Sequence, residues 1–406
     1  MLAITVVLVA FGSSASPTLR SLGGPGRWLA LVALWICAAL LAALGRHGPP
    51  GRALRTLAWP SGLLVLLAFT SSGYSVLPRL TFERSVTLAV ALSAAALLGY
   101  TTEADPRLVR LLLAAIVAGA AAVAVGGLLL WLVDPSAAVQ GASPGVPARW
   151  RGIGENPNTI SMLAAIALAP AAWLSMPLRR STRTVVWLAS ALALFLTILA
   201  SGSRGALLGG VVAFGLEAAL LPRRTLRRVA GVAAVVAVFG AGALVVQAVV
   251  TTPPQPPVAG GGAKLPVRSL TSTGDSGRLA AWRRALTTGD DRPVLGYGFG
   301  TEEHVFIRRF RDFQGSRPEN SILGLYLQLG SVGVLLLVAA VAVMVGAAVV
   351  GVRRRLLQSV PILCLLAAAL VLMIVQSYIY AVGNVAMVSV WVAGFAGAGA
   401  LAWGKT

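Results

Sequence analysis

The chain has 406 residues, of which 57% are hydrophobic and only 11% are charged, whereas soluble proteins contain about 25% charged residues. So little polar surface cannot cover a soluble globule, and the composition therefore predicts a polytopic membrane protein. The net charge of +20 comes from short basic clusters between apolar runs rather than from one basic face, which argues against a nucleic-acid-binding protein.

About twelve apolar runs are long enough to cross a bilayer, which takes about 20 residues. They cover roughly 1–17, 27–45, 56–73, 84–101, 107–133, 156–176, 183–201, 204–221, 229–250, 320–350, 357–379 and 382–403. We therefore predict an all-α polytopic membrane protein of about twelve transmembrane helices, with one large extracytoplasmic loop that contains short helices. Residues 1–250 would hold the first nine helices, 251–319 the loop and 320–406 the last three.

The basic residues predict the orientation of these helices. With the N-terminus in the cytoplasm, the inner loops carry sixteen Lys and Arg residues and the short outer loops carry seven. Because cytoplasmic loops are enriched in Lys and Arg, this bias favours a cytoplasmic N-terminus and places the long loop outside the cell.

Two short helices are predicted within the long loop, over 277–288 and 302–313. In the second, Phe306, Phe310 and Phe313 recur at helical spacing, so that they share one face. That face could lie on the outer leaflet of the membrane or pack onto the protein's own helices, and the pattern does not distinguish the two.

Three predicted helices begin at the outer face, near Asn156, Arg204 and Asn320. A helix N-terminus presents free N–H groups and a partial positive charge, and so favours anions. Each of the three starts also has an arginine, namely Arg151, Arg204 and Arg317. Arginines at helix N-termini on the outer face are suited to holding a lipid pyrophosphate.

Each of these elements also has a purely structural interpretation. Arg79, Arg84 and Arg149 are expected to extend to lipid headgroups, as outer arginines often do. The run Asn156-Pro157-Asn158 could simply cap a helix. Arg204 is the stronger functional candidate, because almost no polar loop surrounds it and an ionisable residue close to the bilayer is usually functional.

An ordered set of motifs then points to a known family. The set comprises Asn-Pro-Asn at 156–158, Ser-Arg-Gly-Ala at 203–206, Ser-Gly-Arg at 276–278 with Trp282, Pro-Val-Leu-Gly-Tyr-Gly-Phe-Gly-Thr at 293–301, and Asn-Ser-Ile-Leu at 320–323 followed by Gln328-Leu-Gly330 and Gly333. In this order, over roughly 150–335, the chain resembles the O-antigen ligase and O-antigen polymerase family. The resemblance implies an integral-membrane glycosyltransferase of the bacterial plasma membrane, which moves a glycan from undecaprenyl pyrophosphate to an acceptor hydroxyl at the outer face without a metal or cofactor.

The resemblance also suggests site residues. The family usually has a histidine, thought to be catalytic, directly before the asparagine of the last motif, and Glu319 stands there in this chain. A carboxylate keeps a possible general base at this position, although the exchange could also mark a different acceptor or an inactive relative. Arg278 and Glu319 are the expected catalytic residues. The expected pyrophosphate-binding residues are Arg204, Arg151, Arg317, Asn156 and Asn158, and weaker substrate-binding candidates are Asn320, Arg283, Arg284, His304, Gln376, Tyr378 and Asn384.

The expected partners are an undecaprenyl-pyrophosphate-linked glycan donor, a glycan, lipid or protein acceptor, and membrane lipid, but no nucleic acid. Alternative functions are a transporter or flippase of lipid-linked sugars, a peptidoglycan-type polymerase, and an inactive component of polysaccharide assembly. Transporters tend to place charges near the midplane of the membrane, whereas here the charges gather at helix ends and in one loop. Nothing in the sequence names the acceptor, so ligase and polymerase remain equivalent at this point.

Overall fold

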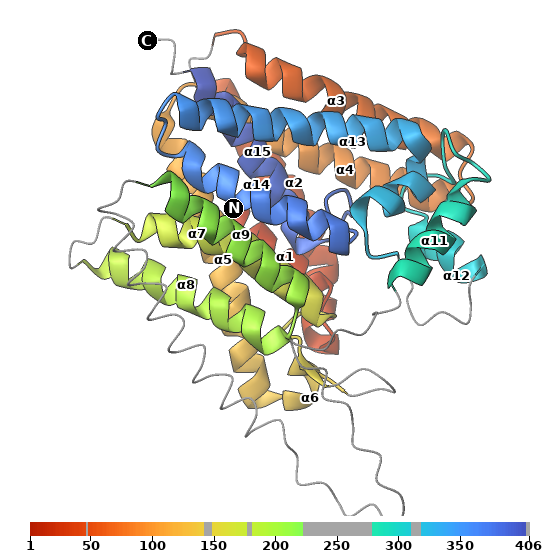
Figure 1. Ribbon diagram of the computed structural model, residues 1–406, viewed down its shortest axis with the longest axis horizontal. Helices are drawn as coiled ribbons and strands as arrows, with labels where there is room; N and C mark the ends of the chain where they lie inside the picture. The colour runs from red at the N-terminus through yellow and green to blue at the C-terminus, as the bar shows by residue number, and fades with distance from the viewer. Residues whose placement is uncertain (46–47, 142–147, 177–180, 222–277, 310–317, 403–406) are drawn as a thin grey trace, which may run out of the picture.

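The computed structural model describes residues 1–45, 48–141, 148–176, 181–221, 278–309 and 318–402 (Figure 1). The described residues are almost entirely helical, as predicted. The helices are α1 (Leu2–Gly12), α2 (Pro17–Leu44), α3 (Arg52–Thr70), α4 (Pro78–Thr102), α5 (Pro106–Val133), α6 (Pro135–Ala138), α7 (Pro157–Leu174), α8 (Thr182–Ser201), α9 (Arg204–Leu220), α11 (Arg278–Gly289), α12 (Glu302–Arg309), α13 (Ser321–Arg353), α14 (Ser359–Val375) and α15 (Val385–Ala400). A 3₁₀ turn, η1 (Ser71–Gly73), follows α3, and the strands β1 (Val139–Gln140) and β2 (Arg149–Trp150) form one antiparallel pair.

Seven of these helices are long and apolar enough to cross a membrane, namely α2, α3 with η1, α4, α5, α7, α8 and α13. Helices α1, α14 and α15 are apolar but shorter. The polytopic class is therefore confirmed, whereas the count of twelve is not. The predicted ninth span, 229–250, and the first part of the loop, up to 277, lie outside the described residues.

Two boundaries near the N-terminus differ from the prediction. The first apolar run was expected to span from 1 to 17, but α1 ends at Gly12, because the serine-rich segment after it turns the chain. Helix α2 then begins at Pro17, ten residues before the predicted start at 27. Arg20 and Arg27, two of the seven basic residues counted above in the short outer loops, therefore lie within α2.

The connections between helices fall at two opposite ends of the bundle. At one end, Gly51 donates its N–H to Glu103, and the Tyr100 hydroxyl donates to the carbonyl of Gly48 over 2.6 Å. At the other end, Val76 donates to the carbonyl of Tyr297 over 3.1 Å, which joins the turn after α3 to the loop before α13. The α2–α3 and α4–α5 connections therefore lie at one end and the α3–α4 connection at the other, as expected of helices that cross a membrane in turn.

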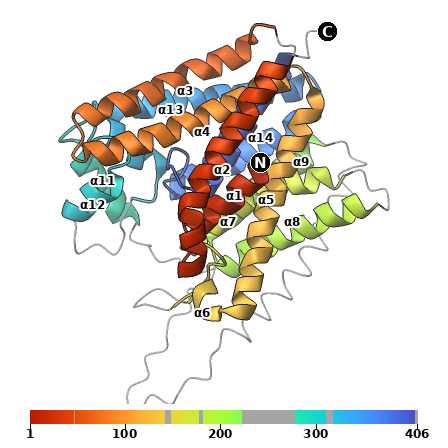
Figure 2. The same cartoon turned by 180° about the vertical axis from the view of Figure 1, so that it is seen from behind.

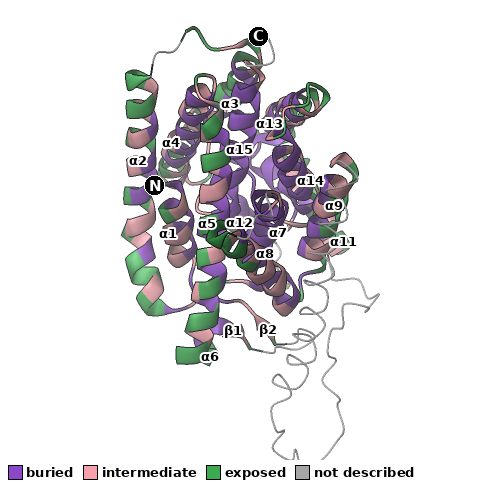
Figure 3. Cartoon of the chain, turned by 90° about the vertical axis from the view of Figure 1, so that its left-hand side faces the viewer, coloured by how far each residue is buried: buried purple, intermediate pink, exposed green. Residues whose placement is uncertain are grey.

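Helix α15 forms the centre of the bundle, and all of its residues are buried (Figure 3). It contacts α4, α5, α7, α13 and α14, and it is apolar around its whole circumference, as a fully enclosed helix must be. Gly99 of α4 and Gly399 of α15 allow the two backbones to approach so closely that a side chain at either position would overlap the opposite helix. Figure 2 shows α2 lying on the outside of this core, over α1 and α4.

Helix α13 contains a break that is filled by the loop 293–300. Gly330 has a φ of 61° and a ψ of −162°, which are not helical. Around this break, the N–H groups of Tyr297 and Gly298 donate to the carbonyls of Leu327 and Gln328, both over 2.9 Å. The glycine-rich loop therefore supplies the hydrogen bonds that the broken helix has lost.

The two predicted loop helices are present as α11 and α12, beside the N-terminal end of α13 (Figure 1). Phe306 is fully buried in a small core with Ala281, Ala285 and Leu327, so this phenylalanine packs onto the protein's own helices rather than onto lipid. The predicted partners of its stripe, at 310 and 313, lie outside the described residues.

Candidate active site

An ion pair joins the two residues that the sequence predicted to be catalytic. Arg278, at the start of α11, donates from Nη2 and Nε to Oε2 of Glu319, over 2.9 and 3.3 Å. Both side chains are about one-third exposed, at 31% and 36%. Trp282, one turn further along α11, donates from Nε1 to the carbonyl of Pro318 over 2.8 Å. Two contacts from one short helix therefore hold Glu319 in place.

The backbone at Glu319 is strained. Its φ is 47°, and among the described residues only Glu319 and Arg355 have a positive φ without being glycine. This left-handed conformation costs an ordinary side chain roughly 1–2 kcal/mol. A strained residue that persists next to a site often serves that site, so the geometry favours a functional role for Glu319.

Asn320 fastens the start of α13 to the end of α14. Its Oδ1 accepts the N–H groups of Ile322 and Leu323 as a helix cap, and its Nδ2 donates to the carbonyl of Ile374 over 3.1 Å. Its backbone N–H donates to Ser377 Oγ over 3.2 Å. Asn320 thus positions Glu319, and its contact with a sugar stays a prediction.

Arg204 lies beside the same helix end. Ser203 caps α9, and Arg204 is its exposed first residue. Gly205 packs against α14 so closely that a β-carbon there would lie 2.7 Å from Cγ2 of Val375. Helix α14 therefore ends between the start of α9, which carries Arg204, and the start of α13, which follows Glu319. The structure brings both predicted elements to one end of α14.

The start of α7 is held by Arg149, for which the sequence predicted only contact with lipid. Arg149 donates from Nε to the carbonyl of Ser201 over 2.8 Å and from Nη2 to Oδ1 of Asn158 over 2.9 Å. The lipid interpretation is wrong for this residue, because its guanidinium joins the end of α8 to the start of α7. Asn156 accepts the N–H of Asn158 as the helix cap, so both asparagines have the structural role that was the alternative to pyrophosphate binding.

Arg151 points to a different part of the molecule. Its Nε and Nη2 donate to the carbonyls of Ala137 and Ser136, over 3.0 and 3.2 Å, and so fasten β2 to α6. The Ser136 hydroxyl and the Ala137 N–H hold the pKa of Asp134 below its ordinary value, and Arg151 adds to that shift. Arg151 therefore supports the turn around α6, and nothing in its contacts favours the predicted pyrophosphate role.

The remaining candidates differ in accessibility. The Tyr378 hydroxyl is fully buried and donates to the carbonyl of Ala369 over 2.7 Å, so it does not face a substrate. The carbonyl of Gln376, at the end of α14, accepts a hydrogen bond from Ser321 Oγ over 2.6 Å. Exposed positions on α11 and α12 are held by Arg283, Arg284 and His304, whereas Arg317 lies outside the described residues.

The sequence did not identify Glu302, the first residue of α12. This buried carboxylate accepts from Ser377 Oγ over 2.9 Å, from Gln328 Nε2 over 3.1 Å and from the Tyr380 hydroxyl over 3.1 Å. Ser377 in turn accepts from the Asn320 N–H. Glu302 therefore connects the break in α13 with the position of Glu319. Its place directly after the glycine-rich motif was the only signal in the sequence.

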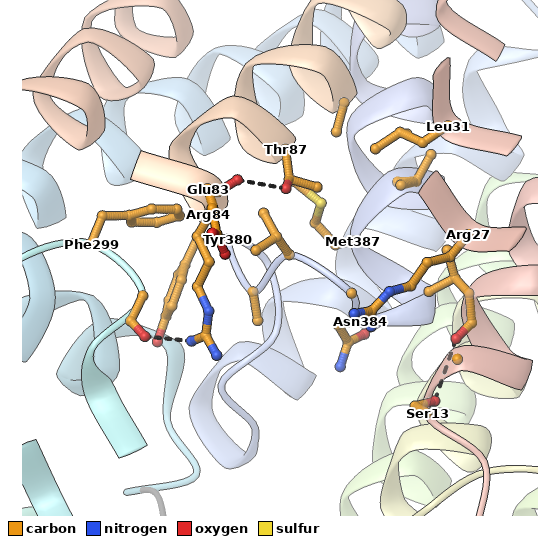
Figure 4. Close-up of a pocket in the computed structure, with 18 of the residues that line it drawn as sticks. Ser13, Arg27, Leu31, Glu83, Arg84, Thr87, Phe299, Tyr380, Asn384 and Met387 are labelled. Carbon is orange, nitrogen blue, oxygen red and sulfur yellow. Dashed lines mark hydrogen bonds between the residues drawn. The ribbon is translucent and has the colours of Figure 1, made fainter. Parts of the chain in front are cut away.

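A polar cavity of about 430 Å³ opens next to Glu302 (Figure 4). Arg84 lines one wall and donates from Nη1 to the carbonyl of Gly300, and Arg27 and Asn384 lie on the opposite wall. Among the predicted site residues that the structure describes, Asn384 alone lines this cavity. Like Arg149, Arg84 was expected to extend to lipid headgroups, and the structure contradicts that expectation. No group of three or more His, Cys, Asp or Glu side chains that could hold a metal ion occurs in the described part of the chain.

A comparison with protein families agrees with the motifs. The model of the family described as O-antigen ligase matches residues 188–338, from α8 into α13, and so covers Arg204, Arg278 and Glu319. No curated protein matches the chain. The resemblance to the O-antigen ligase family is thus confirmed over residues 188–338 of this membrane protein.

Proposed function

We propose that this protein is an O-antigen ligase- or polymerase-like glycosyltransferase that moves a glycan from undecaprenyl pyrophosphate to an acceptor hydroxyl at the outer face of the plasma membrane. The Arg278–Glu319 ion pair supports the proposal most directly, since a guanidinium suited to a pyrophosphate lies beside a carboxylate suited to accept a proton. The family match independently supports a membrane glycosyltransferase.

The cationic groups suit the pyrophosphate of the donor. The contact with Glu319 uses Nε and Nη2 of Arg278, which leaves Nη1 on the other side of the planar fork to donate to a pyrophosphate oxygen. Arg204 stands exposed at the N-terminus of α9, where the helix dipole adds to the attraction for an anion. Such fixed donors stabilise the negative charge that grows on the leaving group. Arg317 remains part of the proposal as a neighbour of Glu319 in the chain.

Glu319 would act on the acceptor. The acceptor oxygen attacks the anomeric carbon of the donor sugar, and a new carbon–oxygen bond forms. The bond between that carbon and the pyrophosphate oxygen breaks, and undecaprenyl pyrophosphate leaves with the bonding electrons. The Glu319 carboxylate takes the proton from the attacking hydroxyl, which is the task of a general base. These steps need no metal or other cofactor.

The test uses purified protein in proteoliposomes with undecaprenyl-pyrophosphate oligosaccharides and acceptor lipids extracted from the native host. Release of undecaprenyl pyrophosphate and the mass of the glycan product are followed together. We expect release with a transferred or lengthened glycan, and the product mass separates ligase from polymerase. Arg278→Ala should lower the rate by about a hundredfold or more, as the loss of a charged donor in a transition state does.

Arg55→Ala is the matched control, because Arg55 is exposed on α3 at the opposite end of the bundle. It should transfer glycan at the wild-type rate. The proposal fails if Arg278→Ala also does so at equal protein levels. Movement of the intact lipid-linked sugar between leaflets, without release, would instead establish the transporter function.

A further inference from the structure

The cavity beside Glu302 has walls of mixed charge. Arg27 and Arg84 contribute hydrogen-bond donors, whereas Glu155 and Glu303 contribute carboxylates. Arginine can only donate and an ionised carboxylate can only accept, so a complementary ligand needs groups that do both. Hydroxyl groups have this property. A lipid tail would match neither kind of group, a simple anion would match only the arginines, and a simple cation would match only the carboxylates.

The size and position of the cavity fit a sugar. Its volume of about 430 Å³ falls within the range of roughly 300–1,000 Å³ found for small-molecule sites. Its walls come from α1, α2, α4, α7, α12 and α15, and most of these elements lie outside the matched domain of 188–338. Figure 4 shows Arg84 and Arg27 entering from opposite walls, which leaves room for a ligand between them.

The cavity is connected to the ion pair by two hydrogen bonds. Glu302, which lines the cavity, accepts from Ser377 Oγ over 2.9 Å, and Ser377 accepts the Asn320 N–H over 3.2 Å. Asn320 directly follows Glu319. A glycan in the cavity would therefore be connected to the proposed reacting centre through Glu302, Ser377 and Asn320.

We infer that this cavity is a glycan-binding subsite, which holds a polyhydroxylated sugar unit between Arg27 and Arg84 while an adjoining unit reacts near Glu319. The inference rests on the proposed function. The sugar could belong to the donor or to the acceptor, since both present the same hydroxyl chemistry.

The test measures binding of a free oligosaccharide, released from the native lipid-linked donor by mild acid, to the purified full-length protein. Two variants probe the cavity from different walls. Arg27→Gln removes a charged donor, and Thr87→Phe fills space on α4, where Thr87 lines the cavity. Each should weaken binding by about tenfold or more, the effect expected from losing one charge-assisted hydrogen bond or its space. Arg55→Gln, at the far end of the bundle, should bind like wild type.

Competition in the transfer assay identifies the sugar's source. If the free oligosaccharide raises the KM of the lipid-linked donor, the subsite holds donor glycan. If it instead raises the KM of the acceptor, the subsite holds acceptor glycan, and both outcomes support the inference. Binding that is absent in wild type, or equal in wild type and both cavity variants, overturns it even when transfer proceeds normally. Binding that the two variants lose, in a protein that transfers nothing, keeps the subsite and rejects the proposed reaction.

Discussion

Glu319→Asn is expected to slow glycan transfer strongly while leaving the protein about as stable as before. Asparagine keeps a polar side chain just before α13, although it is one methylene shorter, and it cannot take up a proton as a carboxylate does. It also accepts the left-handed conformation more readily than glutamate. The substitution therefore separates the chemistry of this position from its structural role.

The expected stability change is the sum of two small terms of opposite sign. The lost ion pair joins side chains that are 31% and 36% exposed, and such pairs contribute about 0–1 kcal/mol. Relief of the backbone strain at φ 47° should raise the unfolding free energy by about 1 kcal/mol. The net change in unfolding free energy should therefore stay within about 1 kcal/mol, whereas the loss of a general base lowers the rate by about 10²–10⁴-fold.

Thermal unfolding in detergent and glycan transfer in proteoliposomes measure the two effects. Arg355→Asn is the matched control, because Arg355 has a φ of 60° and lies at the other end of α13. It should relieve the same kind of strain and leave transfer unchanged. Transfer by Glu319→Asn at the wild-type rate would show that Glu319 is not the base. A loss of several kcal/mol in stability would show instead that the ion pair is mainly structural.

Three further predictions concern the framework of the site. Gly330→Ala should prevent the folded protein from accumulating, because a β-carbon there would overlap the carbonyl of Val294. Gly346→Ala, in open space on the same helix, should raise the unfolding free energy by up to about 1 kcal/mol. Equal size-exclusion profiles of the two variants after heating would refute this prediction. Glu302→Leu should cost about 3 kcal/mol or more in thermal unfolding, since its three hydrogen-bond donors lose their acceptor, and a neutral effect would mean that water or other groups replace it. Arg149→Lys should cost about 1–3 kcal/mol, because an ammonium cannot reproduce the two directions of the guanidinium, and equal unfolding of this variant and wild type would argue against the junction that we describe.

The helices were largely predictable from the sequence because their signals are local. Apolar length and capping residues both act within a few positions of the helix end, and Asn156 and Asn320 cap the helices that they were expected to begin. The early end of α1 and the early start of α2 were missed. Hydropathy alone does not show where a short serine-rich turn interrupts an apolar run.

The site was only partly predictable, because its contacts join distant segments. Arg278 and Glu319 were both selected, although they are 41 positions apart. The sequence predicted contact with lipid headgroups for Arg84 and Arg149 and pyrophosphate binding for Arg151. In the structure, Arg149 joins two helix ends, Arg151 supports α6, and Arg84 lines a cavity. Nothing near an arginine in the sequence indicates which distant carbonyl or carboxylate it will meet.

Hydrogen bonds link the glycine-rich motif to Glu319, the proposed catalytic carboxylate, so the motif can affect the site without touching a substrate. The loop 293–300 fills the break in α13, and Gln328, beside that break, accepts the Gly300 N–H over 2.6 Å and donates to Glu302 over 3.1 Å. From Glu302 the hydrogen bonds continue through Ser377 to the residue that follows Glu319. A change at the break should therefore shift the cavity wall and Glu319 together, so that substitutions around Gln328 alter sugar binding and transfer rate in parallel.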